Sequence, residues 1–294
     1  MNGTSFRSDI RYWLRQGNTI NHLLFWNIVV FLVLNIPRVI AYFVPAVSGV
    51  DQFIYDQVAL HSLLPVFITK PWGLITYMFS HVEIFHILFN MLNLYFFGNL
   101  FRSFLGNHRV LPLYMLGGLI GGLAYLLVFN IFKTSDYNMV GASASMVAIL
   151  VACATKIPNY EVGLMFIGPV RLKWLALAVV VLDVISIGKG NEGGIVAHLG
   201  GALFGFLYIK MLDNGTDLCQ PLVWLFNRRV RVEAMQNRNR RSFKPKKSPL
   251  RVVKNQPEEN KQLRLDQLLD KINDRGMESL SPEEKAWLQK MSQE

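Results

Sequence analysis

"MVGASASMVAIL", residues 139–150, is the start of a long apolar segment, yet it opens on small residues and hydroxyls. It is one of several apolar blocks in a chain of 294 residues, of which 52% are hydrophobic. A bilayer core is about 30 Å thick and is crossed by about 20 apolar residues in a helix, and lipid admits only helices and closed barrels. The blocks lack the alternation of barrel strands, so we expect an all-α polytopic membrane protein.

Six apolar runs have the length of a membrane span. They are 23–44, 83–103, 110–132, 140–156, 172–188 and 194–212. The first 20 residues are polar and contain no apolar core of a cleaved signal peptide, although the spacing of their apolar residues predicts a short interfacial helix. We therefore divide the chain into an N-terminal cytoplasmic or interfacial segment, a six-helix membrane domain, a basic cytoplasmic linker and a helical hairpin tail: 1–20, 21–213, 214–256 and 257–294.

The net charge of +10 is concentrated after the last span. Residues 228–254 contain eleven Lys or Arg and one acidic residue, Glu233. We expect this basic segment to lie against anionic lipid headgroups. We expect no nucleic-acid partner, because the segment contains only one aromatic residue, Phe243, and no nucleic-acid-binding fold surrounds it. The excess of Lys and Arg on one side of the spans puts both termini in the cytoplasm. The short N-terminus and this tail favour a bacterial inner (plasma) membrane.

The tail has the signals of two short helices. "LRLDQLLDKIND", residues 263–274, repeats leucine at helical spacing, and Gly276 follows as a helix stop. Ser281, Pro282 and Glu284 then form the signature of a capping box with proline in the first turn. The sequence predicts a small helical hairpin here, without a catalytic group.

Strongly polar residues occur at one end of spans two, four and six. Span two carries His86 and Asn90, span four opens on Ser143, and span six carries His198. In the predicted topology these three span ends share one leaflet, so the side chains share one depth. Because polar groups in lipid are costly, each is a functional candidate.

Each of these residues also has a structural explanation. Ser143 could be a helix cap, His198 an interhelical donor, and His86 and Asn90 a hydrogen-bonded pair one turn apart. Together, however, they supply a nucleophile, a base and oxyanion donors. Zinc is the rival use of the histidines, but no acidic or cysteine ligand completes such a site, so we expect no metal and no cofactor. Asp183, in span five, is expected to pair with polar groups near the interface rather than to take part in catalysis.

The three motifs, in their order along the chain, resemble the rhomboid family of intramembrane serine proteases. They are "HVEIFHILFN" (81–90), "GASAS" (141–145) and "AHLGGALFG" (197–205), and the resemblance covers residues 20–212. It implies Ser143 as nucleophile and His198 as general base, a dyad without a third carboxylate, and an oxyanion site made by Asn90, His86 and the Ser143 amide. It further implies that the substrates are transmembrane segments of other membrane proteins, cut near the extracytoplasmic face. The connection 45–80 would be a membrane-embedded loop and span five a lateral gate.

Four positions depart from the family pattern. Ala144 follows the serine where many members have glycine, and Val147 replaces an aromatic that stacks on the base histidine. Trp72-Gly73 stands in place of a Trp-Arg pair, and Arg102 in place of a glutamate. None of these changes removes a reacting group.

The small residues answer a geometric requirement of this chemistry. A serine is activated by a base within about 2.6–3.2 Å, so the helices that carry Ser143 and His198 must approach closely. Gly141, Gly201 and Gly205 allow such an approach, and a serine at a helix N-terminus meets unpaired amides that favour developing negative charge. Two other functions stay open: a catalytically silent relative that binds transmembrane segments, and a small-solute transporter whose first span is interrupted at Pro37.

Overall fold

The computed structural model describes residues 6–15, 17–44, 46, 49–132, 136–164, 167–226 and 257–292. The chain forms two compact units, Met1–Gln236 and Asn237–Glu294, which we describe separately. The predicted basic segment, 228–254, lies outside the described residues, as does most of the predicted linker.

The first unit begins with α1 (Phe6–Arg15), in the segment where the apolar spacing predicts a short helix. The long helix α2 (Thr19–Phe43) follows, capped by the Asn18 side chain, which accepts a hydrogen bond from the Ile20 amide at 3.0 Å. α2 runs through Pro37 without a break, so the interrupted span that a transporter would use is not present in this helix.

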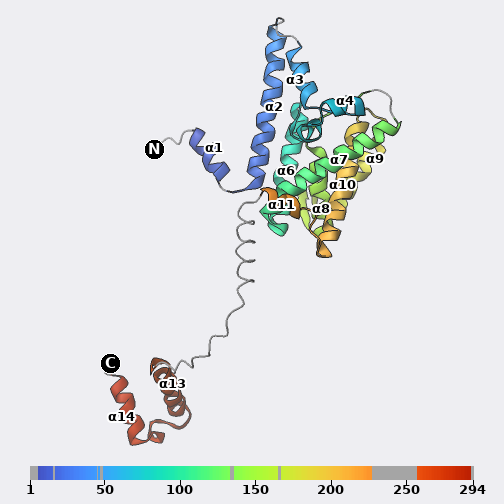
Figure 1. Ribbon diagram of the computed structural model, residues 1–294. Helices are drawn as coiled ribbons and strands as arrows, with labels where there is room; N and C mark the ends of the chain where they lie inside the picture. The colour runs from blue at the N-terminus through green and yellow to red at the C-terminus, as the bar shows by residue number, and fades with distance from the viewer. Residues whose placement is uncertain are drawn as a thin grey trace, which may run out of the picture. The chain divides into compact units, whose positions relative to one another are not determined.

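The connection after α2 folds into short elements. These are α3 (Val50–Val58), β1 (Leu60–His61), α4 (Leu64–Thr69), α5 (Gly73–Thr76) and the 3₁₀ turn η2 (Tyr77–Phe79). Figure 1 shows α3 beside the C-terminal part of α2. β1 pairs antiparallel with β2 (Asn138–Met139), in the register Leu60 to Met139. This ladder joins the connection to the start of the stretch 139–150.

Among the described residues, four helices are long and apolar enough to cross a membrane. They are α2, α6 (Ile84–Leu105), the stretch Asn107–Phe132, which joins the turn η3 (Asn107–Arg109) to α7 (Val110–Phe132), and α10 (Glu192–Asp213). The expected polytopic helical membrane protein is thereby confirmed, and the described part of the chain adds two small two-stranded sheets to the helices.

The fourth and fifth predicted spans are shorter than expected. α8 (Ser143–Lys156) and α9 (Leu172–Ile185) have 14 residues each, which is about 21 Å of helix, against a hydrocarbon core of about 30 Å. The hairpin of β3 (Glu161–Leu164) and β4 (Gly168–Arg171) joins them, and α11 (Gln220–Phe226) follows α10. α8 is buried along most of its length, so it is a core helix surrounded by protein.

Glycines let α7, α8 and α10 pack with their backbones in contact. A Cβ on Gly201 would lie 2.3 Å from the Ala144 carbonyl oxygen, and one on Gly205 would lie 2.2 Å from that of Ala148. On α7, a Cβ on Gly121 would lie 2.6 Å from the carbonyl oxygen of Ala197. No larger residue fits at these positions, and this confirms small-residue packing as the reason for the glycines.

The second unit contains α13 (Pro257–Arg275), the 3₁₀ turn η4 (Met277–Ser279) and α14 (Pro282–Met291). Ser281 caps α14: its hydroxyl accepts from the Glu284 amide, and the Glu284 carboxylate accepts from the Ser281 amide at 2.7 Å. Lys271 of α13 donates to the same carboxylate at 2.9 Å. The predicted helical hairpin and its capping box are confirmed.

Candidate functional site

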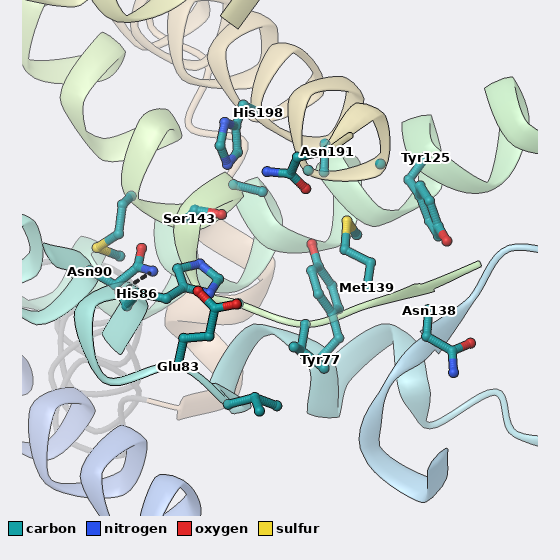
Figure 2. A pocket seen from close by; sticks show the side chains of 18 of the residues that line it. Tyr77, Glu83, His86, Asn90, Tyr125, Asn138, Met139, Ser143, Asn191 and His198 are labelled. Carbon is teal, nitrogen blue, oxygen red and sulfur yellow. Dashed lines mark hydrogen bonds between the residues drawn. The ribbon is translucent and has the colours of Figure 1, made fainter. Parts of the chain in front are cut away.

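A cavity of about 1200 Å³ is lined by residues from α2, α6, α8, α9 and α10. It collects the polar residues that the sequence places at one depth: His86 and Asn90 of α6, Ser143 of α8 and His198 of α10. Figure 2 shows the His198 ring facing Ser143, with His86 and Asn90 on the other side of the serine. The four predicted site residues are therefore brought together.

Ser143 is the first residue of α8, and the turn before it is held by hydrogen bonds. The Gly141 amide donates to the Tyr77 carbonyl at 2.9 Å, and the Ala142 amide donates to His81 Nε2 at 3.2 Å. Gly141 has φ +133°, and a Cβ there would lie 2.6 Å from His86 Cε1. Only glycine satisfies both demands, so Gly141 lets the His86 ring approach the backbone beside the serine.

His81 has a larger role than the sequence suggested. It is the first residue of the "HVEIFHILFN" motif, where the sequence assigns it no role in the site, yet the residue is fully buried at 0% exposure. Its ring packs edge-on against His86, with centroids 5.2 Å apart, and its Nε2 anchors the residue before Ser143. In the sequence, only its position shortly before His86 and Asn90 indicates a role for His81. Its contact with the turn before Ser143 depends on tertiary structure.

Asn90 is 5% exposed, and its side-chain amide donates to the His86 carbonyl at 2.9 Å (Figure 2). That bond, one turn back along α6, fixes the orientation of the amide and leaves its second N–H available to the cavity. The first turn of α8 offers unpaired backbone amides beside Ser143, as any helix N-terminus does. Together these groups can stabilise a negative oxygen next to the serine.

His198 is bonded to Asp183, which the sequence predicts to pair near the interface rather than to take part in catalysis. Its Nδ1 lies 3.1 Å from both carboxylate oxygens of Asp183, and both side chains are 17% exposed. α9 and α10 are joined by the short connection 186–191, and this antiparallel pair brings position 183 level with position 198. The expectation that Asp183 pairs with a polar group is met, and the group is the candidate base itself.

Ser143 and His198 share the cavity but are not hydrogen-bonded to one another. Such bonds are often long until a substrate tightens the site. The Ser145 side chain points toward α7 and not toward His198: a Cβ on Gly118 of α7 would lie 2.6 Å from the Ser145 Oγ. Within the described ranges, no group of three or more histidine, cysteine or acidic side chains is arranged to hold a metal ion.

The departure at Trp72-Gly73 has a local cause. A Cβ at position 73 would lie 2.7 Å from the Ala59 carbonyl oxygen, so no side chain fits there. The Trp72 indole instead donates to the Gln57 carbonyl at 2.7 Å. The connection is thus anchored by backbone contact and one indole bond, and no arginine is needed.

Comparisons with known proteins give two family matches. The Rhomboid domain matches residues 69–214, and a family of unknown function (DUF6576) matches residues 254–294. Presenilin-associated rhomboid-like protein A, mitochondrial, of Danio rerio is 35% identical over 45% of this chain and 35% of its own length. RHOMBOID-like protein 12, mitochondrial, of Arabidopsis thaliana is 33% identical over 44% of this chain and 43% of its own.

A longer alignment is found with presenilin-associated rhomboid-like protein, mitochondrial, of Homo sapiens. It is 26% identical over 69% of this chain and 52% of its own length. The chain therefore spans between about a third and a half of the length of these relatives.

The names of these relatives contradict the predicted membrane. They are mitochondrial proteins, so a bacterial inner membrane, with both termini in the cytoplasm, is the wrong expectation. A short polar N-terminus and a basic tail describe how a chain sits in a bilayer, and neither feature is specific to one bilayer.

Proposed function

Because the chain belongs to the rhomboid family, we propose that it is an intramembrane serine endopeptidase that cleaves transmembrane segments of other membrane proteins. The observation that carries the proposal is one cavity lined by Ser143, His198, His86 and Asn90. A hydroxyl, an imidazole and oxyanion donors around one space are the parts that acyl transfer requires.

In the proposed reaction, Ser143 Oγ attacks the carbonyl carbon of the scissile peptide bond. Its proton passes to His198 Nε2 as the Oγ–C bond forms, and the carbonyl oxygen becomes an oxyanion. When the C–N bond breaks, the proton passes from His198 to the leaving amine, which leaves an acyl-enzyme. Water, deprotonated by the same imidazole, then releases the new carboxyl end and restores the serine.

The oxyanion would be stabilised by the Asn90 amide, the His86 ring and the backbone N–H of Ser143. The positive end of the α8 dipole points the same way. Loss of one such donor typically costs about 2.7–4 kcal/mol of transition-state stabilisation. The bond from Asn90 to the His86 carbonyl supports this role, because a pre-oriented amide needs no reorganisation during the reaction.

The substrate class follows from the shape of the site. The cavity reaches from α2 to α10, and the exposed apolar side chains of Phe85 and Phe89 are among its lining, which suits an apolar, extended segment. Charged groups in its lining, including Arg38, Asp51 and Glu83, would admit water for hydrolysis. In line with the names of its relatives, we place the enzyme in a mitochondrial membrane.

The test uses the full chain in proteoliposomes with a panel of fluorophore-tagged single-span membrane proteins. We expect the wild type to cleave at least one of them, and Ser143→Ala to abolish the cleavage. Ser145→Ala is the matched control, because it removes a hydroxyl from the same turn that faces α7 and makes no hydrogen bond within the described part of the chain. Equal processing by wild type and Ser143→Ala would favour the catalytically silent alternative, a protein that binds transmembrane segments.

A further inference from the structure

We propose that Asp183 is the positioning residue of the candidate base, so that the site works as a chain of three groups, carboxylate, imidazole and hydroxyl. This inference rests on the proposed function. Its observation is the contact of His198 Nδ1 with both carboxylate oxygens of Asp183, each at 3.1 Å.

The contact determines which ring nitrogen of His198 carries the proton. A carboxylate only accepts hydrogen bonds, so the proton of a neutral His198 resides on Nδ1. Nε2 then has a free lone pair, and this is the atom that a base must present to a serine. Loss of the carboxylate would let the other tautomer form, with its proton on Nε2, and that tautomer cannot accept the proton of Ser143.

The contact also fixes the plane of the ring. None of the aromatic contacts among the described residues involves His198, and Val147, which lines the cavity, offers no ring to stack on it. Asp183 comes from α9, a different helix, so its two oxygens restrain rotation that α10 alone would allow. With Nδ1 bound to Asp183, the imidazole keeps its Nε2 edge directed into the cavity.

The charge of Asp183 is available to His198. Among the described residues, the only ion pair of this carboxylate is the one to His198, and both side chains are 17% exposed. When His198 takes the proton of Ser143, an imidazolium forms in a poorly solvated site. The adjacent carboxylate stabilises that cation without taking the proton.

The connection between α9 and α10 explains how the sequence builds this pair. α9 ends at Ile185 and α10 begins at Glu192, so the intervening six residues return the chain antiparallel. Asp183 lies in the last turn of α9, and His198 lies two turns into α10. A shift of one residue in either helix would turn one of the two side chains away from the other.

The experiment compares kcat and KM for the wild type, Asp183→Asn and Asp183→Glu in proteoliposomes. Asp183→Asn keeps the size of the side chain but lets an amide donor meet Nδ1, which favours the wrong tautomer. We expect kcat to fall by about 100-fold or more with KM nearly unchanged, since enzymes that lose this carboxylate lose up to about 10⁴-fold. Asp183→Glu, which retains an acceptor, should recover part of the lost kcat.

Asp213→Asn is the matched control, because it removes an ion pair with Lys156 at the far end of α10 and leaves His198 untouched. Wild-type kcat in Asp183→Asn, with Ser143→Ala inactive, would overturn this inference alone. If wild type and Ser143→Ala did not differ, the proposed function and this inference would fall together. If the thermal melting curve shows that Asp183→Asn is unfolded, the test uses Asp183→Glu and Asp183→Ala instead. A kcat of Asp183→Glu no higher than that of Asp183→Ala would contradict the proposal that Asp183 positions His198.

Discussion

Gly201→Ala tests whether the close approach of α8 and α10 is what assembles the site. A Cβ at position 201 would lie 2.3 Å from the carbonyl oxygen of Ala144, the residue after Ser143. Cβ contacts under 3.0 Å essentially never occur, so one backbone must retreat by about 0.7 Å. His198 is one turn from this contact, so the retreat separates the base from the serine.

The magnitude follows from that displacement. Overpacking of a core costs about 1–3 kcal/mol, against which alanine recovers at most about 1 kcal/mol of helix propensity. A misplacement near 1 Å can lower a rate by about 100-fold. We therefore expect Gly201→Ala to lower both the thermal midpoint in detergent and, by about 30- to 100-fold, the kcat/KM for the cleaved substrate.

Gly98→Ala is the matched control for this prediction. Its Cβ would also be crowded, at 2.6 Å, but by the Cδ1 of Ile20, the end of a flexible side chain that can rotate away. Near wild-type stability and kcat/KM are expected for this variant. If Gly201→Ala matched Gly98→Ala in both measurements, the backbone contact would not control the geometry of the site.

Three further predictions concern other parts of the chain. His81→Ala leaves the buried Ala142 amide without its acceptor and should lower stability by about 1–3 kcal/mol, measured by thermal unfolding; an unchanged midpoint would show that this bond is dispensable. Burial alone would raise the pKa of Asp136, but hydrogen bonds from His61 and two backbone amides outweigh it and lower that pKa. The hydrogen bonds of Asp136 to segment 61–63 should therefore be intact above about pH 4 and lost as pH falls further. Limited proteolysis of segment 61–63 should begin only at acid pH in the wild type, whereas Asp136→Asn should be cut at every pH; the same pH dependence in both would contradict the prediction. Ser281→Ala should destabilise the first turn of α14 by about 0.5–2 kcal/mol, seen as faster amide exchange there, and equal exchange rates would refute the cap.

The positions of the membrane helices could be predicted from hydropathy, but two of their lengths could not. Each predicted span contains a helix, yet α8 begins only at Ser143 and α9 ends at Ile185. Apolar composition does not distinguish a helix that faces lipid from one buried in protein, and α8 is of the second kind. The strands β1 and β2 have two residues each, too few for any periodic signal.

The residues of the candidate site could be predicted better than the hydrogen bonds that hold them in place. His86, Asn90, Ser143 and His198 were identified because polar groups at one depth in a membrane are unusual. The bond of Asp183 to His198 depends on the register between α9 and α10, and the bond of His81 depends on a turn 61 residues away. Neither relation is encoded in local spacing, so both required the structure.

Covalent labelling by a fluorophosphonate, which reacts only with an activated serine, tests directly whether His198 activates Ser143. We expect one adduct per chain in the wild type, mapped by mass spectrometry to Ser143, and none in His198→Ala within the same time. Labelling of His198→Ala at the wild-type rate, or a wild-type protein that stays unlabelled at Ser143, would contradict this expectation.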